Sequence, residues 1–410
     1  MQSMPLVIPI QARRTTWIPF NPCLLISLAL LLWLHYDTYR AHNKAVEFAY
    51  GCDDFGYLRQ ARLFQQNGPI GGLNTAITDE NTIYLIAKLQ SLAEPFNWAL
   101  MAGPHCHNYK RQTGHVIFQY PPLTGLVLSL FPEGRRARLN LALVGVILVG
   151  FLSLTAINAR AVTVPLLAAA LGAFLLTGLK RYGFSWSIMG SALLLTFLGY
   201  LTVRTSNALV RRWRRLAEFL LGLVLGLSVG FRISNLLLVS GFIAILGIEF
   251  VRRPSSRAGS SMLSASAGFI LGLAPVLAAN TINAGSPFFT TYGQADATPV
   301  HWGADILWSG IRYYFAIDPP AGGYAIAAVV MAATALMWSL MRRRHDLAKS
   351  AAIAGISLLA SLCFVVMHEV RITYYLFPAA AYAAATAFFC FIACEDDKEN
   401  GTDQISLPSH

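Results

Sequence analysis

Charged residues are scarce in this sequence. Asp, Glu, Lys and Arg make up 12% of its 410 residues, against about 25% in a typical soluble domain. Hydrophobic residues make up 55%, and a water-soluble protein of this composition would expose large apolar patches. The scarcity of charge excludes an ordinary soluble domain. We therefore expect one integral membrane domain over residues 1–394, followed by a polar cytoplasmic tail over residues 395–410.

Long polar segments are also few. The hydrophobic residues come in blocks of about 20 residues, the length of a helix that spans a bilayer core. No small-residue cleavage site follows the first block, so we expect it to be retained as a helix. We predict an all-α integral membrane fold of about ten spans, over residues 18–36, 138–157, 162–179, 184–203, 216–231, 233–250, 261–279, 322–341, 350–367 and 373–393.

The net charge of +11 would suggest a nucleic-acid partner in a soluble protein. Here the basic residues cluster at the ends of the apolar blocks, so they indicate orientation and no nucleic-acid partner is expected. Lys and Arg in short loops mark the cytoplasmic side. We therefore expect a multi-pass protein of the inner (cytoplasmic) membrane with both termini in the cytoplasm. The richer set of connections holds Arg13, Arg14, Arg160, Arg204, Arg211, Arg212, Arg214, Arg215, Arg252, Arg253, Arg257, Arg342, Arg343, Arg344, Lys349 and Lys398, and the poorer set holds Lys180, Arg181, Arg232, Arg312 and Arg371.

Two longer connections then lie outside, over residues 37–137 and 280–321. Within the first, the apolar stretch 120–131 has only about 12 residues, too few to cross a bilayer. We predict a short helix in the outer interface there, started by Pro121 and Pro122. Most histidines and most acidic residues before the tail also fall outside, so we expect any chemistry on this periplasmic or extracytoplasmic face. The structural alternative is that a long wet loop simply contains polar residues.

Two adjacent acids, Asp53 and Asp54, open the first helix predicted in the long loop. Carboxylates at a helix N-terminus are favoured by its free amides and its dipole, which explains one of them structurally. The functional alternative is a general base that takes a proton from an acceptor hydroxyl. A second carboxylate beside it would raise the pKa of one of the pair.

The stretch from Asp53 to Ala61 resembles the Asp-Glu-x-x-Tyr-x-x-x-Ala signature of GT-C-type membrane glycosyltransferases, the superfamily of protein O-mannosyltransferases and lipid A aminoarabinose transferases. Asp53, Asp54, Tyr57 and Ala61 match its positions in turn, with Asp in place of Glu at the second. Further matches follow in the family's order over roughly residues 35–385: Tyr120-Pro-Pro-Leu123, Arg138-Leu-Asn-Leu-Ala142, Gly230-Phe-Arg232-Ile-Ser234, Asn283-Ala-Gly-Ser286-Pro287 with Tyr292, and Arg371-Ile-Thr-Tyr374-Tyr-Leu-Phe-Pro378.

The resemblance implies a glycosyltransferase that moves a sugar from a polyprenyl-phosphate donor to an acceptor hydroxyl on the outer face, with inversion. Asp53 or Asp54 would be the base, and membrane lipid would be a partner. Metal-binding members of the family carry acids after the third span, whereas Lys180–Trp186 holds none. This argues against a divalent metal cofactor without excluding one, and no other cofactor is expected.

Basic residues at outer helix ends are candidates for binding the donor phosphate. Arg371 is the first choice, Lys180 and Arg181 the second, and Arg232 joins them. Arg binds phosphate through paired charge-assisted hydrogen bonds, although a basic residue at a helix end also snorkels for structural reasons. The residues predicted to bind the substrate are Tyr57, Tyr292, Tyr374, His301 and Trp302. Their structural alternative is to anchor the chain at the membrane interface.

Only two of the six cysteines, Cys52 and Cys106, fall in the long outer loop. An oxidising compartment permits them to form a disulfide. The competing interpretation is a metal site made of His105, Cys106, His107 and His115, whose one-residue spacing is unlike that of common zinc sites.

Two other functions stay open. A polytopic lipid or sugar transporter, or a flippase, would favour internal repeats and acids inside spans, whereas Glu218 and Glu249 lie at predicted cytoplasmic helix ends. A catalytically inactive assembly protein of the same architecture would show the same sequence features. The sugar, the acceptor and any partner membrane proteins are not identifiable from the sequence.

Overall fold

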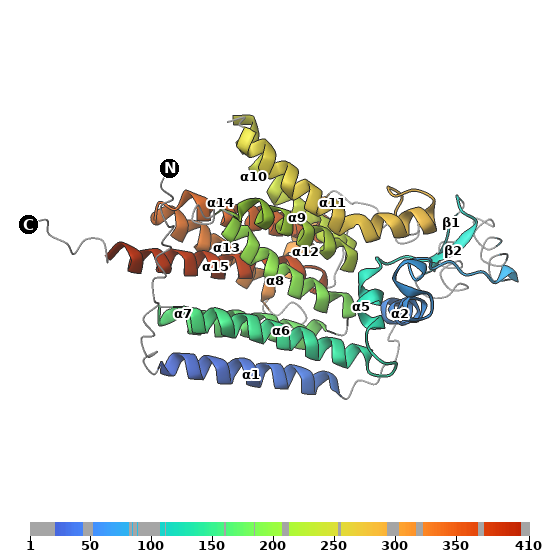
Figure 1. Cartoon of the computed structure of the whole chain (residues 1–410), viewed down its shortest axis with the longest axis horizontal. Coiled ribbons are helices and arrows are strands. Elements are labelled where there is room, and N and C mark those ends of the chain that lie inside the picture. The colour runs from blue at the N-terminus through green and yellow to red at the C-terminus, as the bar shows by residue number, and fades with distance from the viewer. Residues whose placement is uncertain are drawn as a thin grey trace, which may run out of the picture.

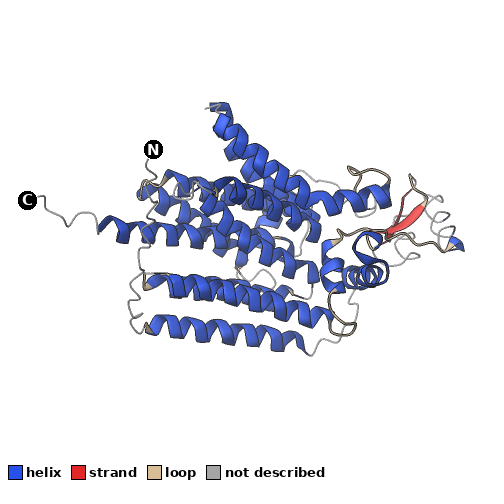
Figure 2. Cartoon of the chain, viewed as in Figure 1, coloured by secondary structure: helices blue, strands red, loops and turns tan. Residues whose placement is uncertain are grey.

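The computed structural model describes residues 21–43, 52–81, 84, 88, 107–110, 112–159, 161–183, 185–206, 213–252, 256–292, 303–316, 323–367 and 373–402. Long helices run side by side, and a smaller group of elements covers one end of them (Figures 1 and 2). Nine helices among these residues are long and apolar enough to cross a membrane. This agrees with the prediction of an all-α, multi-pass membrane protein.

The long apolar helices are α1 (Pro22–Asn43), α6 (Arg136–Asn158), α7 (Thr163–Tyr182), α8 (Trp186–Ser206), the continuous pair η1 (Ile233–Leu238) and α10 (Val239–Arg252), α11 (Ser256–Ala284), α13 (Tyr324–Met341), α14 (His345–Met367) and α15 (Phe377–Thr402). A further helix of the bundle, α9 (Arg214–Phe231), packs along α8 and α11. Its first five residues include Arg214, Arg215 and Glu218, so its apolar stretch is shorter than those of its neighbours.

Small residues set how closely the helices approach. In α15, Ala380, Ala383 and Ala385 are fully buried, and the helix packs on α8, α13 and α14. A Cβ at Gly199 of α8 would lie 2.8 Å from the Cβ of Ala385. Membrane helices gain packing contacts when small residues let their backbones come together, and this is why the alanine-rich α15 occupies the centre of the bundle.

The elements that cover one end form the cap. They are α2 (Cys52–Gly71), α5 (Leu123–Ser129) and the antiparallel strands β1 (His107–Lys110) and β2 (His115–Phe118). α2 is interrupted at Gly68, whose φ of 75° breaks the helix just before Pro69. α5 follows Pro122, has only seven residues, and packs on α2, α6 and α9. The predicted short helix within 120–131 is therefore present, and its position in the outer interface stays a prediction.

The cap is fastened to α11 by one buried amide. The Asn283 side-chain oxygen accepts from the Thr75 backbone N–H at 2.9 Å and from its hydroxyl at 3.2 Å. The Asn283 Nδ2 donates to the Leu73 and Ala279 carbonyls, both at 2.8 Å. Thr75 also accepts from Arg59 through its carbonyl and from the Phe118 N–H through its hydroxyl. These bonds tie α2, β2 and α11 at one point.

We call the end under the cap the capped end. The opposite end, where α8, α10 and α13 end and α9, α11 and α14 begin, is the basic end; both are seen in Figure 1. Several predicted boundaries were wrong by more than one turn. α1 continues to Asn43, and α15 runs to Thr402 in the predicted tail. α14 begins at His345, five residues before the prediction, because its early charges are neutralised by Arg344–Asp346 and Lys349–Glu249 ion pairs.

Candidate functional site

A buried arginine marks the capped end. Arg232 is the extended residue between α9 and η1, with φ −147° and ψ 126°. It is 8% exposed, and its Nη1 donates to the hydroxyl of Ser187 at 2.8 Å and, at 3.4 Å, to that of Ser185. Its Nε is buried without a hydrogen-bond partner. None of the ion pairs found among the described residues includes it.

Aromatic rings lie against this guanidinium. Tyr374 and Tyr375, in η3 (Thr373–Tyr375), stack on each other at 5.0 Å between ring centres. The Arg232 Cζ lies 5.2 Å from the ring centre of Tyr374 and 4.5 Å from that of Tyr375. Both distances are within the range of cation–π attraction.

Three more tyrosines extend the group. Tyr57 of α2 and Tyr292, in the segment after α11, are within electrostatic reach of the Arg232 charge. Tyr120 joins them, at 5.4 Å from the ring centre of Tyr57 and 5.6 Å from that of Tyr292. We call these five tyrosines the tyrosine cluster. The structure thus brings together four residues predicted for the site, Arg232, Tyr57, Tyr292 and Tyr374, from four separate parts of the chain.

The electrostatics of Arg232 favour an anion. Removing an ion from water costs several kcal/mol even after relaxation. A desolvated cation–π contact returns about 2 kcal/mol, and the serine hydroxyls satisfy only one nitrogen of the guanidinium. Part of the cost is therefore left uncompensated by the described protein groups. A phosphate, which accepts two parallel hydrogen bonds from one guanidinium, would compensate it.

Other predicted phosphate ligands lie elsewhere. Lys180 pairs at 2.6 Å with Asp37 of α1, and Arg181 lies over the ring of Tyr182 at 5.7 Å. Both lie at the end of α7, which packs against α1 and α6. Lys180 therefore already has a counter-charge, unlike Arg232.

Several predicted residues lie outside the described part of the chain: Arg371, His301, Trp302 and Cys106, with the side chains of Cys52, Asp53 and Asp54. The backbone of residues 52–54 is described and forms the first turn of α2. Asp53 and Asp54 thus precede Tyr57 by four and three residues along one helix, a spacing that puts positions on the same helix face.

One buried cation escaped the sequence analysis. Arg136, at the start of α6, is fully buried, and its Nη2 donates to the side-chain oxygen of Gln65 on α2. Its Nε and Nη1 have no hydrogen-bond partner. The family-like pattern had pointed to Arg138 instead. Arg135, Arg136 and Arg138 are adjacent in sequence, and no periodicity distinguishes the one that turns inward.

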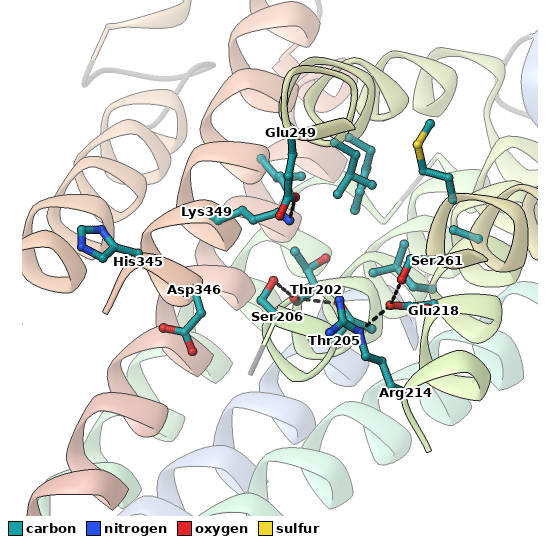
Figure 3. A pocket seen from close by; sticks show the side chains of 16 residues that line it. Thr202, Thr205, Ser206, Arg214, Glu218, Glu249, Ser261, His345, Asp346 and Lys349 are labelled. Atoms are coloured by element: carbon teal, nitrogen blue, oxygen red, sulfur yellow. Dashed lines mark hydrogen bonds and ion pairs between the residues drawn. The ribbon is translucent and has the colours of Figure 1, made fainter. Parts of the chain in front are cut away.

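The cavity beside the tyrosine cluster is small, about 10 Å³, with Gln60, Tyr120 and Thr291 in its lining. A much larger one of about 480 Å³ lies at the basic end (Figure 3). Its walls come from the ends of five helices, α8, α9, α10, α11 and α14. A cavity formed by such distant segments cannot be predicted from any local sequence pattern.

Among the described side chains, no three His, Cys, Asp or Glu residues gather as a metal site would require. The acids at positions 53 and 54 are not covered by that statement. Comparisons with family models, curated proteins and solved structures find no match for this chain.

Proposed function

We propose that this chain is a membrane glycosyltransferase of the GT-C type, which moves a sugar from a polyprenyl-phosphate carrier to an acceptor hydroxyl. The observation that carries the proposal is Arg232, a buried guanidinium without a carboxylate partner among the described residues, placed against tyrosine rings under the cap. An arginine is costly inside a membrane domain and usually marks a functional site. Tyrosine rings beside it suit a sugar, because their faces pack on its C–H surfaces.

In the proposed reaction, the carboxylate of Asp53 or Asp54 takes the proton from the acceptor hydroxyl. The acceptor oxygen then attacks the anomeric carbon from the face opposite the phosphate. A new C–O bond forms as the bond from that carbon to the phosphate oxygen breaks, and the configuration inverts. Arg232 stabilises the negative charge that grows on the departing phosphate.

We assign the capped end to the extracytoplasmic side of the inner membrane and the basic end to the cytoplasm. The support is the positive-inside rule. Arg214, Arg252 and Arg344 all lie at the basic end, where α15 also ends. Under this orientation the polyprenyl phosphate would present its head group at the depth of Arg232.

The first test uses native mass spectrometry to measure the binding of undecaprenyl phosphate to the purified full-length chain. Arg232→Met should weaken binding by about 30-fold or more, since loss of a buried charged partner costs at least about 2 kcal/mol. Its thermal stability should hold or rise, because an apolar side chain replaces a buried ion. A purely structural arginine would instead lose stability on substitution. Arg62→Met is the matched control, because Arg62 is an exposed cap arginine paired with Glu133.

The second test measures transfer of radiolabelled sugar in membranes that contain the chain. Asp53→Asn and Asp54→Asn should show which acid is the base: that variant should lose transfer but still bind undecaprenyl phosphate.

Unchanged phosphate binding by Arg232→Met would refute the anion site. Binding that depends on Arg232, without transfer of any polyprenyl-phosphate sugar, would favour a carrier of the same lipid over an enzyme.

A further inference from the structure

The cavity at the basic end is built from paired charges. The Arg214 Nε donates to Glu218 Oε1 at 2.7 Å, and Lys349 pairs with Glu249 (Figure 3). Asp346, also in the lining, is held by both Nε and Nη2 of Arg344, at 3.1 and 2.9 Å. Each of these cations therefore has an acidic partner, and the three described pairs are neutral as a group, although Arg344 itself is not part of the lining.

One atom in this arrangement is left over. Glu218 is the most buried of the charged groups, with its side chain 9% exposed. Its Oε1 accepts from both Arg214 and the hydroxyl of Ser261, each at 2.7 Å. Its Oε2 is buried and has no hydrogen-bond partner. A buried carboxylate oxygen without a donor is expensive, so the site calls for a ligand that donates, and a cationic donor gives the strongest bond.

The cavity is polar at its mouth and apolar inside. On α9, Leu221 lies one turn further into the bundle than Glu218. On α14, Ile353 lies one turn further in than Lys349. On α10, Leu246 and Phe242 follow Glu249 inward. α10 packs on α14 and α11 packs on α9, and the cavity lies between these two helix pairs. Its ligand therefore has a charged head and an apolar continuation.

We propose that this cavity binds the head group of an aminophospholipid, with a primary ammonium on the Glu218 carboxylate and the phosphate between Arg214 and Lys349. A zwitterion adds one charge of each sign to a lining that is already balanced. The ammonium supplies N–H donors to a carboxylate that is incompletely hydrogen-bonded in the described protein. The two cations are 35% and 26% exposed, so they remain accessible to a phosphate at the mouth. The volume of about 480 Å³ is that of a small-molecule site. This site is independent of the function proposed above.

The test compares head groups on the full-length chain in detergent. Dioctanoyl phosphatidylethanolamine should raise the melting temperature in a saturable way. Dioctanoyl phosphatidylcholine has a trimethylammonium without N–H donors and should bind at least about tenfold more weakly. Anionic phosphatidylglycerol should also bind more weakly. Free phosphoethanolamine, tested at the same concentrations, separates a lipid from a water-soluble source and should give no comparable shift.

Two variants and one control make the result specific. Glu218→Gln keeps an acceptor for Ser261 but loses the charge, and should lower phosphatidylethanolamine affinity about tenfold without changing that for phosphatidylcholine. Leu246→Trp fills the apolar part and should abolish binding while leaving Glu218 in place. Ile248→Trp, on the same helix at a residue that is 50% exposed, is the matched control and should bind normally.

The proposal fails if phosphatidylethanolamine and phosphatidylcholine bind equally, if phosphatidylglycerol binds best, or if Glu218→Gln binds as tightly as the parent. Equal shifts from free phosphoethanolamine and from the lipid would overturn the lipid assignment. If Glu218→Gln does not fold, the comparison of Leu246→Trp with Ile248→Trp decides, and equal binding by those two variants overturns the site.

Discussion

A close glycine-lined contact between α9 and α11 predicts a large effect for the substitution of glycine by alanine. Gly222 and Gly226 of α9 face Gly268 and Gly272 of α11. A Cβ at Gly222 would lie 1.9 Å from the carbonyl oxygen of Ala265, and one at Gly268 would lie 2.0 Å from that of Phe219. Both obstacles are main-chain atoms of a helix, which no side-chain rotation removes. Gly222→Ala should therefore force the two helices apart.

The size of the effect follows from the geometry. Ordinary contact begins at 3.4 Å, so the oxygen of Ala265 must retreat by about 1.5 Å. Overpacking in a core costs about 1–3 kcal/mol, and a rigid main-chain obstacle argues for the upper end. Alanine is intrinsically a better helix former than glycine by about 1 kcal/mol. We expect a net destabilisation of about 2 kcal/mol for Gly222→Ala.

The assay is thermal unfolding in detergent, monitored by the fluorescence of the tryptophans. Gly150→Ala is the matched control, because Gly150 lies within α6 and its added Cβ would have no described atom within 4 Å outside the neighbouring backbone of its own helix. That variant should be as stable as the parent or more stable. The double variant Gly222→Ala/Gly226→Ala should lose less than the sum of the two single losses, since the first displacement makes room for the second methyl. If Gly222→Ala is as stable as Gly150→Ala, α9 and α11 do not pack as described.

Three further predictions concern the cap. Asn283→Ala removes four hydrogen bonds and leaves buried backbone groups unpaired at about 1–3 kcal/mol each, so amide exchange at the cap should accelerate, whereas Asn158→Ala at an exposed helix end should not change it. The hydrogen bond and charge of Arg62 hold the pKa of Glu133 below its usual value; this contribution is present above the unfolded pKa and is lost as the pH falls through the folded one. Arg62→Gln should therefore raise the pKa of Glu133, measured by carboxyl-selective ¹³C NMR, with little change in melting temperature because both groups are exposed. Gly56→Ala would put a Cβ 1.7 Å from the ring of Phe118. The variant should bind undecaprenyl phosphate more weakly, because it displaces the aromatic side chains packed under α2. Unchanged binding would show that this aromatic packing does not support the site.

Most of the helical bundle was predictable because each apolar block of about 20 residues indicates one membrane-spanning helix. The length of a helix in hydrocarbon is fixed by the bilayer, so local composition is enough. The short helix after Pro122 was predictable for the same reason, since an apolar stretch of about 12 residues does not reach across a bilayer. The helix ends were less predictable. At the start of α14, Lys349 pairs with Glu249 of α10, a partner that the local sequence does not reveal, whereas Asp346 pairs with Arg344 only two residues before it.

The cap strands and α12 (Ala304–Tyr314) were missed. β1 and β2 have four residues each, and beyond their pairing with each other β2 gains only a single bridge, from Val116 to Ile77, among the described residues. Strands this short show too little alternation of polar and apolar residues to be predicted from sequence. α12 lies in the predicted loop 280–321 and packs on α14. α12 has only eleven residues, which is fewer than the roughly 20 that a helix needs to span a bilayer core. Its sequence therefore gave no sign of a span.

Arg232 and its tyrosines show the limit of sequence reasoning for the site. Each was chosen separately from the order of family-like motifs, and the structure shows that four of them meet. Nothing in the sequence indicated that Lys180 is neutralised by Asp37 while Arg232 is left without an acid among the described residues. That distinction depends on which helices are neighbours, because α7 packs beside α1 and α9 turns into η1 under the cap.

Three buried charged side chains of the described chain keep atoms without a hydrogen-bond partner: Arg232 and Arg136 at the capped end and Glu218 at the basic end. Arg232 at the capped end lacks an anion, and Glu218 at the basic end has an oxygen that lacks a donor. The remaining ion pairs of the described chain bring oppositely charged residues together and need nothing more. A membrane domain that retained these incompletely hydrogen-bonded buried groups for stability alone would gain by replacing them with apolar residues. Arg232 and Glu218 are therefore better explained by ligands of opposite charge, and the stability of Arg232→Met without ligand is the measurement on which that argument depends.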